Sequence, residues 1–196
     1  MNSIEVFTER LRLRPVKDED AGPTSTLMRA EIAANLTTWA PETTVAAAKE
    51  RIDSSRRLLT KREALDLAIL DQQSGSLIGW LSLFREGDRK QVARIGFWLG
   101  CDYQGQGLAV EAAERTMALG LDFLGVSELE ACVYPWNTQC IRAIDKLRFN
   151  PDGTTELYSP VRKKTETAFL FRRGFSRSVE RVGERHLAVD GRPVAD

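Results

Sequence analysis

Residues 95–112 read IGFWLGCDYQGQGLAVEA, an apolar stretch that runs through a glycine-containing loop directly into a helical pattern. Gly105 and Gly107 stand one residue apart, and glycine lets backbone N–H groups approach a ligand closely and adopt positive φ. A helix start adds unsatisfied N–H donors and the positive end of the helix dipole. The stretch predicts an anion site suited to a diphosphate; the alternative is a flexible turn that merely precedes a helix.

Two common nucleotide-binding motifs are absent from this turn. The pattern GxxxxGK[ST] does not occur, and GxGxxG would require a glycine at Val110. Kinases, nucleotide hydrolases and ordinary nicotinamide enzymes are therefore disfavoured.

Hydrophobic periodicity on either side of the turn predicts alternating strands and helices. Strands are expected at 11–16, 64–70, 77–84, 92–99, 129–133, 154–158 and 167–171, and helices at about 18–32, 44–62, 108–124 and 138–147. This order predicts a mixed α/β (α+β) fold with a mostly antiparallel, twisted sheet of about seven strands flanked by about four helices.

Length and composition predict one folded domain with a short appendage. The chain has 196 residues, of which 42% are hydrophobic, enough for one globular core. We expect residues 1–175 to form that domain. The charged segment 176–196 is then a C-terminal extension, either an extra strand or hairpin or a mobile end.

The charge balance and the cysteines narrow the class of protein. Lysine plus arginine equal aspartate plus glutamate at 28 each, which disfavours nucleic-acid and membrane-surface binding. Cys101, Cys132 and Cys140 form no CxxC pair, and His186 is the single histidine, so no metal site is expected. No apolar leader or membrane span is evident, which predicts a reducing, cytoplasmic location.

Three blocks of the sequence resemble the GNAT superfamily of N-acetyltransferases. Gln104-x-x-Gly107-x-Ala109 resembles its Q/R-x-x-G-x-G/A signature, which grips the pyrophosphate of coenzyme A (CoA). NTQCIRAIDKLRF at 137–149 and TERLRLRP at 8–15 are similar to blocks of the RimJ/RimL-like subgroup, which acetylates ribosomal-protein N-termini. The resemblance covers about residues 5–175 in the family's order.

The resemblance implies an acyl-CoA-dependent N-acyltransferase that moves acetyl from acetyl-CoA to a primary amine by direct attack in a ternary complex. A protein or peptide N-terminus is the favoured acceptor, and a homodimer is possible. One alternative is transfer from succinyl-CoA or another acyl-CoA to a small amine, since Arg94 and Arg148 could recognise a carboxylate. Another is a catalytically silent acyl-CoA-binding module.

The same resemblance assigns cofactor-binding residues. The backbone of the strand end would pair with the pantetheine arm, and the turn would supply N–H groups to the pyrophosphate. Asn137 would bind the pantetheine region, cap its helix, or do both, and Arg142 would reach the phosphates or simply be exposed. The set is Phe97, Trp98, Leu99, Gln104, Gly105, Gln106, Gly107, Leu108, Ala109, Asn137 and Arg142.

The proton route departs from the family pattern at two positions. Cys140 replaces the usual serine and is either a proton donor, a nucleophile or a packing residue. Arg94 stands where many members carry a glutamate, so Glu156 or Tyr158 is the substitute candidate for the general base. Arg148 replaces a glycine that favours a left-handed helix end, which predicts an altered turn and an added cation near the acceptor.

For the acceptor, Trp39 is expected in the loop between the first two helices, as an aromatic lip of the cleft or as a core residue. Glu31 is a candidate for attracting a cationic amine.

Overall fold

The computed structural model describes residues 4–85, 87, 89 and 91–175. Within these residues the strands form one sheet of eight, in the order β1-β2-β3-β4-β5-β6-β8-β7. The predicted mixed, mostly antiparallel fold is confirmed, because every neighbouring pair is antiparallel except β5 with β6. The segment 176–196, with His186, lies outside the described residues.

The strands are β1 (Val6–Phe7), β2 (Leu11–Pro15), β3 (Ala64–Asp71), β4 (Leu77–Arg85), β5 (Val92–Leu99), β6 (Glu128–Val133), β7 (Asn150–Ser159) and β8 (Lys164–Gly174). The α-helices are α1 (Ala21–Leu27), α2 (Ala30–Ala33), α3 (Val45–Thr60), α4 (Leu108–Leu124) and α5 (Thr138–Lys146). Short 3₁₀ turns at Asp18–Asp20 and Cys101–Tyr103 precede α1 and α4.

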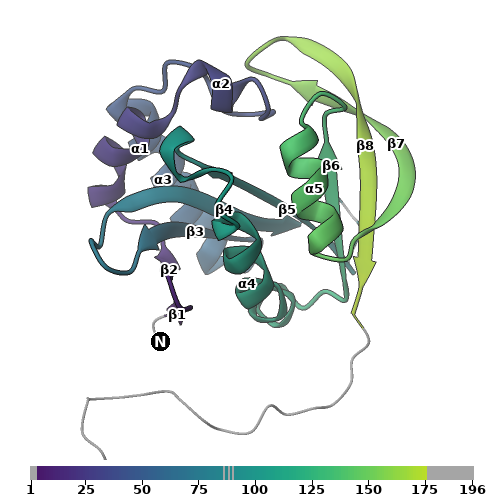
Figure 1. The fold of residues 1–196 in the computed structure, drawn as a ribbon, viewed down its shortest axis with the longest axis horizontal. Coiled ribbons are helices and arrows are strands. Elements are labelled where there is room, and N and C mark those ends of the chain that lie inside the picture. Colours follow the sequence, from purple (N-terminus) through teal and green to yellow (C-terminus); the bar gives the residue numbers. More distant parts are fainter. Residues whose placement is uncertain (1–3, 86, 88, 90, 176–196) are drawn as a thin grey trace, which may run out of the picture.

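The two faces of the sheet carry separate apolar layers, because successive strand residues point to opposite sides. On one face, Leu81 and Leu83 of β4 join the buried side chains of α4 and α5. On the other face, Trp80 of β4 joins a cluster that includes Ile52 of α3. Figure 1 shows α4 and α5 together, on the opposite side of the sheet from α3. The core is thus two layers that share one sheet.

Helix α4 crosses between the parallel strands β5 and β6 and so sets the position of the glycine turn. Its N-terminal cap is Gly107, with φ of 79°, and its C-terminal cap is Gly125, with φ of 65°. Gly120 faces Leu83 so closely that an added Cβ would lie 2.1 Å from Leu83 Cδ1. The missing side chain lets α4 pack directly on β4.

The N-terminal third differs from the prediction. The single helix expected over 18–32 is wrong: Met28 ends α1 in an extended conformation with ψ of 108°, and α2 begins at Ala30. Met28 is buried in the Trp80 cluster, so packing rather than helix propensity decides the break. The strand β1 was not predicted, and it raises the number of strands from about seven to eight.

In the part of the chain that the structure describes, no helix is both long enough and apolar enough to cross a membrane.

Candidate functional site

The site begins where β5 and β6 separate. Their parallel pairing covers only Val92–Arg94 against Glu128–Glu130, although the strands continue to Leu99 and Val133. Backbone N–H and C=O groups at the end of β5 therefore face an opening instead of a neighbouring strand. Such groups need another hydrogen-bonding partner, which can be an extended ligand with amides of its own.

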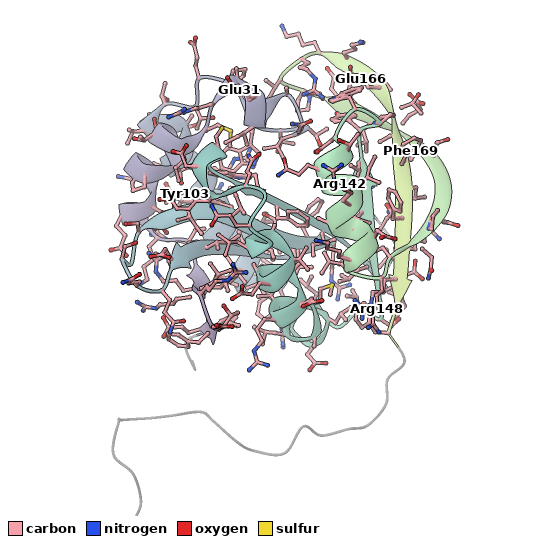
Figure 2. All side chains as sticks on the ribbon, in the orientation of Figure 1. Glu31, Tyr103, Arg142, Arg148, Glu166 and Phe169 are labelled. Carbon is pink, nitrogen blue, oxygen red and sulfur yellow. The ribbon has the colours of Figure 1, made fainter. Side chains whose placement is uncertain are left out.

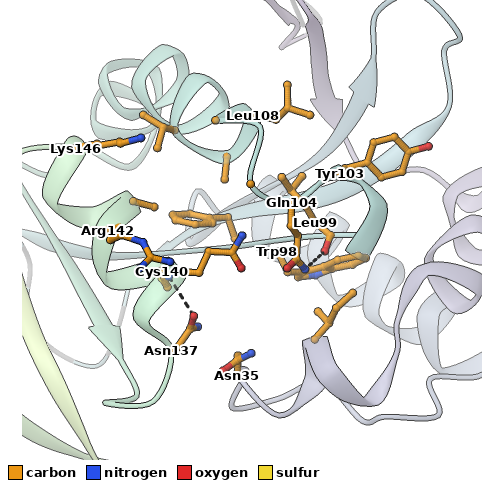
Figure 3. Close-up of a pocket in the computed structure, with 18 of the residues that line it drawn as sticks. Asn35, Trp98, Leu99, Tyr103, Gln104, Leu108, Asn137, Cys140, Arg142 and Lys146 are labelled. Atoms are coloured by element: carbon orange, nitrogen blue, oxygen red, sulfur yellow. Dashed lines mark hydrogen bonds between the residues drawn. The ribbon is translucent and has the colours of Figure 1, made fainter.

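A cavity of about 310 Å³ lies in this opening. Every residue predicted to bind the cofactor lines it except Gln106, and Cys140 lines it as well. Residues that sequence reasoning missed complete the wall, notably Ile32, Asn35 and Leu36 from α2 and its following loop, and Tyr103 and Lys146. Figure 3 shows the labelled side chains around this space, with α4 on one side and α5 on another.

The glycine turn lines one end of the cavity. Gly105 and Gly107 have φ of 75° and 79°, a conformation that L side chains rarely adopt. The Gln104 side chain donates to the Leu99 carbonyl at 2.9 Å, and the Gln106 side chain donates to the Asp102 carbonyl at 2.9 Å. Both glutamine side chains thus stabilise the turn itself, and the N–H groups at the start of α4 are left to bind an anion.

Helix α5 forms the facing wall. Asn137 caps it, because its Oδ1 accepts a hydrogen bond from the Cys140 backbone N–H at 3.1 Å. The cap does not use the amide nitrogen of Asn137, which leaves that donor for a ligand. Arg142 and Lys146 are four residues apart, on one side of the helix, and both line the cavity. None of the described lining residues is an aspartate, glutamate or histidine, so the cavity is cationic.

Comparison with known proteins identifies the family. The family model described as "Acetyltransferase (GNAT) domain" matches residues 10–150. The chain belongs to the GNAT acetyltransferase family. It is 26% identical over 166 residues to an uncharacterized N-acetyltransferase p20 of Bacillus licheniformis, covering 85% of this chain and 93% of that protein.

Solved structures share the fold of this GNAT domain. A ribosomal-protein-S5-alanine acetyltransferase from Vibrio fischeri superposes with a TM-score of 0.77 at 18% identity, over 89% of this chain and 98% of that one. RimL, a ribosomal L7/L12 α-N-protein acetyltransferase in complex with CoA, gives a TM-score of 0.76 at 17% identity, over 88% and 98%. At 17–18% identity these structures show the fold, and the fold that the resemblance implied is therefore confirmed.

Cys140 is the one titratable sulfur in the lining of this acetyltransferase's cavity, within the described residues. Burial raises the pKa of its thiol to about 12. The thiol packs against the core layer of α4 and stays protonated at neutral pH. A thiol of this kind is a poor nucleophile, and it gives up its proton reluctantly to a leaving thiolate of ordinary pKa.

The candidates for the general base lie elsewhere. Glu156 and Tyr158 are on β7, which is separated from β6 by β8, and neither lines the cavity. Leu157 and Ser159 are buried, so the pleat places Glu156 and Tyr158 together on the exposed face of this outer strand. Glu156 accepts a hydrogen bond from the Thr167 hydroxyl at 2.8 Å, and Tyr158 is 60% exposed.

Neither arginine that was considered for recognising a carboxylate lines the cavity. Arg94 Nη2 is paired with Glu130 at 2.9 Å. Arg148 lies just beyond the end of α5, well below the labelled Arg142 in Figure 2. It adopts φ of 57°, so the helix ends in the left-handed conformation that glycine favours, and the expected change in the turn is not observed.

The two residues predicted on the acceptor side do not line the cavity either. Trp39 is 8% exposed, and its ring meets those of Trp80 and Trp98 edge-on at 5.2 Å between centroids. Arg51 covers it at 4.1 Å, so Trp39 is a core residue rather than a lip. Glu31 points to solvent at the surface of α2 (Figure 2).

The β7–β8 turn is hydrogen-bonded to the loop after α2, which contributes Leu36 to the cavity wall. Ser159 Oγ donates to the Thr37 carbonyl at 2.7 Å, and Arg162 Nη1 donates to the Leu36 carbonyl at 2.7 Å. Arg162 Nη2 also donates to the Tyr134 hydroxyl at 2.6 Å. Figure 1 shows this turn beside α2. The contacts with Thr37 and Leu36 join segments more than 120 positions apart, and no local pattern in the sequence indicates them.

Proposed function

We propose that this GNAT acetyltransferase binds acetyl-CoA between β5 and β6 and transfers the acetyl group to a primary amine. The observation that carries the proposal is one continuous cavity that joins the glycine turn to the unpaired edge of β5. The turn suits the diphosphate, since N–H donors and the dipole of α4 favour an anion. The edge of β5 suits the pantetheine amides, and Arg142 and Lys146 supply positive charge for the phosphates.

The chemistry follows from the lining of the cavity. The neutral amine attacks the thioester carbonyl, a C–N bond forms, and the C–S bond breaks to release the CoA thiolate. The amine proton passes to water, and the thiolate takes a proton from solvent, because the described lining holds no carboxylate or imidazole base. The protein's contribution is to place the carbonyl and the amine together in the cavity.

We propose a peptide or protein N-terminus as the acceptor. An α-amine has a pKa of about 8 and a lysine amine one of about 10.4, so at neutral pH far more of the α-amine is already deprotonated. A site without a base in its wall favours the amine that needs no base. The structural neighbours named for acetylating ribosomal proteins point to the same class of acceptor.

Calorimetry with acetyl-CoA and thiol release across an amine panel test the proposal. The panel pairs peptides that have a free N-terminus with the same peptides blocked at the N-terminus and carrying one lysine. We expect micromolar binding of acetyl-CoA and thiol release with the free N-termini. Absence of binding to any CoA species refutes the cofactor site, and binding without thiol release from any amine indicates a silent acyl-CoA-binding module.

A further inference from the structure

The loop between β1 and β2 is joined to the first turn of α4 by a compact polar network. Thr8 Oγ1 donates to Glu111 Oε1 at 2.5 Å, and the Arg10 backbone N–H donates to the same oxygen at 3.1 Å. The Arg10 guanidinium pairs with Glu111 Oε2, at 2.7 Å from Nε and 2.6 Å from Nη2. Thr8 and Arg10 belong to the block TERLRLRP, whose role the cofactor cavity by itself does not explain.

Arg10 also contacts the glycine turn itself. Its Nη1 donates to the Gln106 carbonyl at 3.0 Å. In a trans peptide the C=O and the following N–H point in opposite directions. Holding the Gln106 carbonyl on the Arg10 side therefore turns the Gly107 N–H away from Arg10. Gly107 lines the cavity and Arg10 does not, so this contact favours an N–H directed at a bound diphosphate.

The same network neutralises the negative charge of Glu111 next to the glycine turn. Glu111 lies in the first turn of α4, where a diphosphate is expected to bind. Burial raises the pKa of Glu111. The hydrogen bonds from Thr8 and Arg10 lower it by more, so the pKa lies below its usual value. The carboxylate is thus ionised at neutral pH and would repel an anion. The Arg10 guanidinium, paired directly with it, offsets that repulsion.

We propose that Arg10 is a positioning residue for the diphosphate of CoA: it orients the 106–107 peptide and neutralises Glu111. The inference rests on the proposed function, because it assumes that CoA occupies the cavity. It predicts that removing Arg10 weakens the grip on the diphosphate and leaves the pantetheine end of the site unaffected.

The test compares Arg10→Ala with two other variants. Arg10→Lys keeps the charge but loses the forked geometry that reaches both Glu111 and Gln106. Arg12→Ala is the matched control, since Arg12 is 44% exposed against 47% for Arg10 and forms a similar ion pair, with Glu5. Calorimetry gives the CoA dissociation constant. Steady-state assays give kcat and kcat/KM for acetyl-CoA and for S-acetylpantetheine, which lacks the diphosphate.

We expect Arg10→Ala to raise the CoA dissociation constant and the KM for acetyl-CoA about tenfold, with kcat at saturation and kcat/KM for S-acetylpantetheine within about twofold. For Arg10→Lys both constants should lie between those of the wild type and those of Arg10→Ala, and for Arg12→Ala they should match the wild type. Unchanged CoA affinity in Arg10→Ala overturns the inference. An equal loss of kcat/KM with acetyl-CoA and with S-acetylpantetheine overturns it as well. If the wild type itself binds no CoA, the proposed function fails instead.

Discussion

Arg94 and Glu130 are the last facing residues of β5 and β6 before the strands separate, and their side chains form an ion pair of 2.9 Å. Glu130 is 2% exposed, and it is paired with Arg89 Nη1 as well, at 2.6 Å. The position where the family pattern expects a glutamate thus carries an arginine that is tied to the neighbouring strand. In this chain the residue at that position joins β5 to β6 at the point where the two strands separate.

The ion pairs of Glu130 with Arg89 and Arg94 should make the protein less stable in acid. Although burial raises the pKa of Glu130, its hydrogen bonds with Arg89 and Arg94 lower it from 4.5 to about 2. A lowered folded-state pKa stabilises the protein above about pH 4.5, and this contribution disappears as the pH falls through about 2. The shift corresponds to about 3 kcal/mol. Glu130→Gln should therefore lower the free energy of unfolding by about that amount at pH 7.

Urea unfolding between pH 7 and pH 2 measures this difference. The gap between wild type and Glu130→Gln should shrink towards zero as the pH approaches 2. Glu114→Gln, at an exposed position of α4, serves as the control and should follow the wild type throughout. A gap that stays constant with pH would show that Glu130 titrates normally in the folded protein.

Trp39→Ala should act on stability and not on the acceptor. Truncating a buried tryptophan costs about 3–5 kcal/mol, and Trp39 packs between Trp80 and Trp98. Trp136 is 53% exposed and stacks on Tyr134, so Trp136→Ala should cost about 1 kcal/mol. Chemical denaturation compares the two. A raised KM for the acceptor in Trp39→Ala, without loss of stability, would show that Trp39 forms an aromatic lip of the cleft after all.

Sequence periodicity predicted the elements whose cause is local. The predicted range of α4 matches Leu108–Leu124, and that of β5 matches Val92–Leu99. An apolar pattern determines each of them; Gly107 and Gly125 bound α4, and Gly100 follows β5. The turn between them, which contains Gly105 and Gly107, was found for the same reason. The break at Met28 depends instead on packing against the Trp80 cluster, which no local propensity encodes.

The glycine turn and α5 were predicted from sequence motifs to line the cavity, but α2 and the loop after it were not. Glu156 and Tyr158 lie on a strand that was predicted, β7. The order of strands places β8 between β7 and β6, which keeps both residues away from the cavity, and the sequence does not reveal that order. Arg10 and Glu111 are separated by 101 positions, and Arg162 and Leu36 by 126. Contacts over such separations appear only when the sheet is assembled.

Asn137 offers a test that separates helix capping from ligand binding. Asn137→Ser keeps an oxygen that can accept from the Cys140 N–H but removes the amide donor, and Asn137→Ala removes both. We expect CoA affinity to fall about fivefold in both variants, and the free energy of unfolding to fall by about 1 kcal/mol in Asn137→Ala alone. Calorimetry and denaturation measure these quantities. Wild-type affinity in Asn137→Ser would leave Asn137 with capping alone.

Cys140 should be chemically inert. With a pKa of about 12, only about one thiol in ten thousand is ionised at pH 8. Iodoacetamide should therefore label the exposed Cys101 well before Cys140, which mass spectrometry of tryptic peptides can follow. Cys140→Ala should keep kcat within about twofold. A fall of tenfold or more at unchanged CoA affinity would assign the thiol a chemical role after all.

Arg148→Gly should stabilise the protein. Arg148 adopts φ of 57°, a left-handed conformation that costs an L residue about 1–2 kcal/mol, and glycine removes that cost at the expense of a more flexible unfolded chain. We expect a net gain of about 0.5–1 kcal/mol in urea unfolding. Arg62 has the same φ, but its Nε donates to the Phe123 carbonyl at 3.0 Å. Arg62→Gly loses that contact, so it should gain less than Arg148→Gly; an equal or larger gain would contradict the argument from backbone strain.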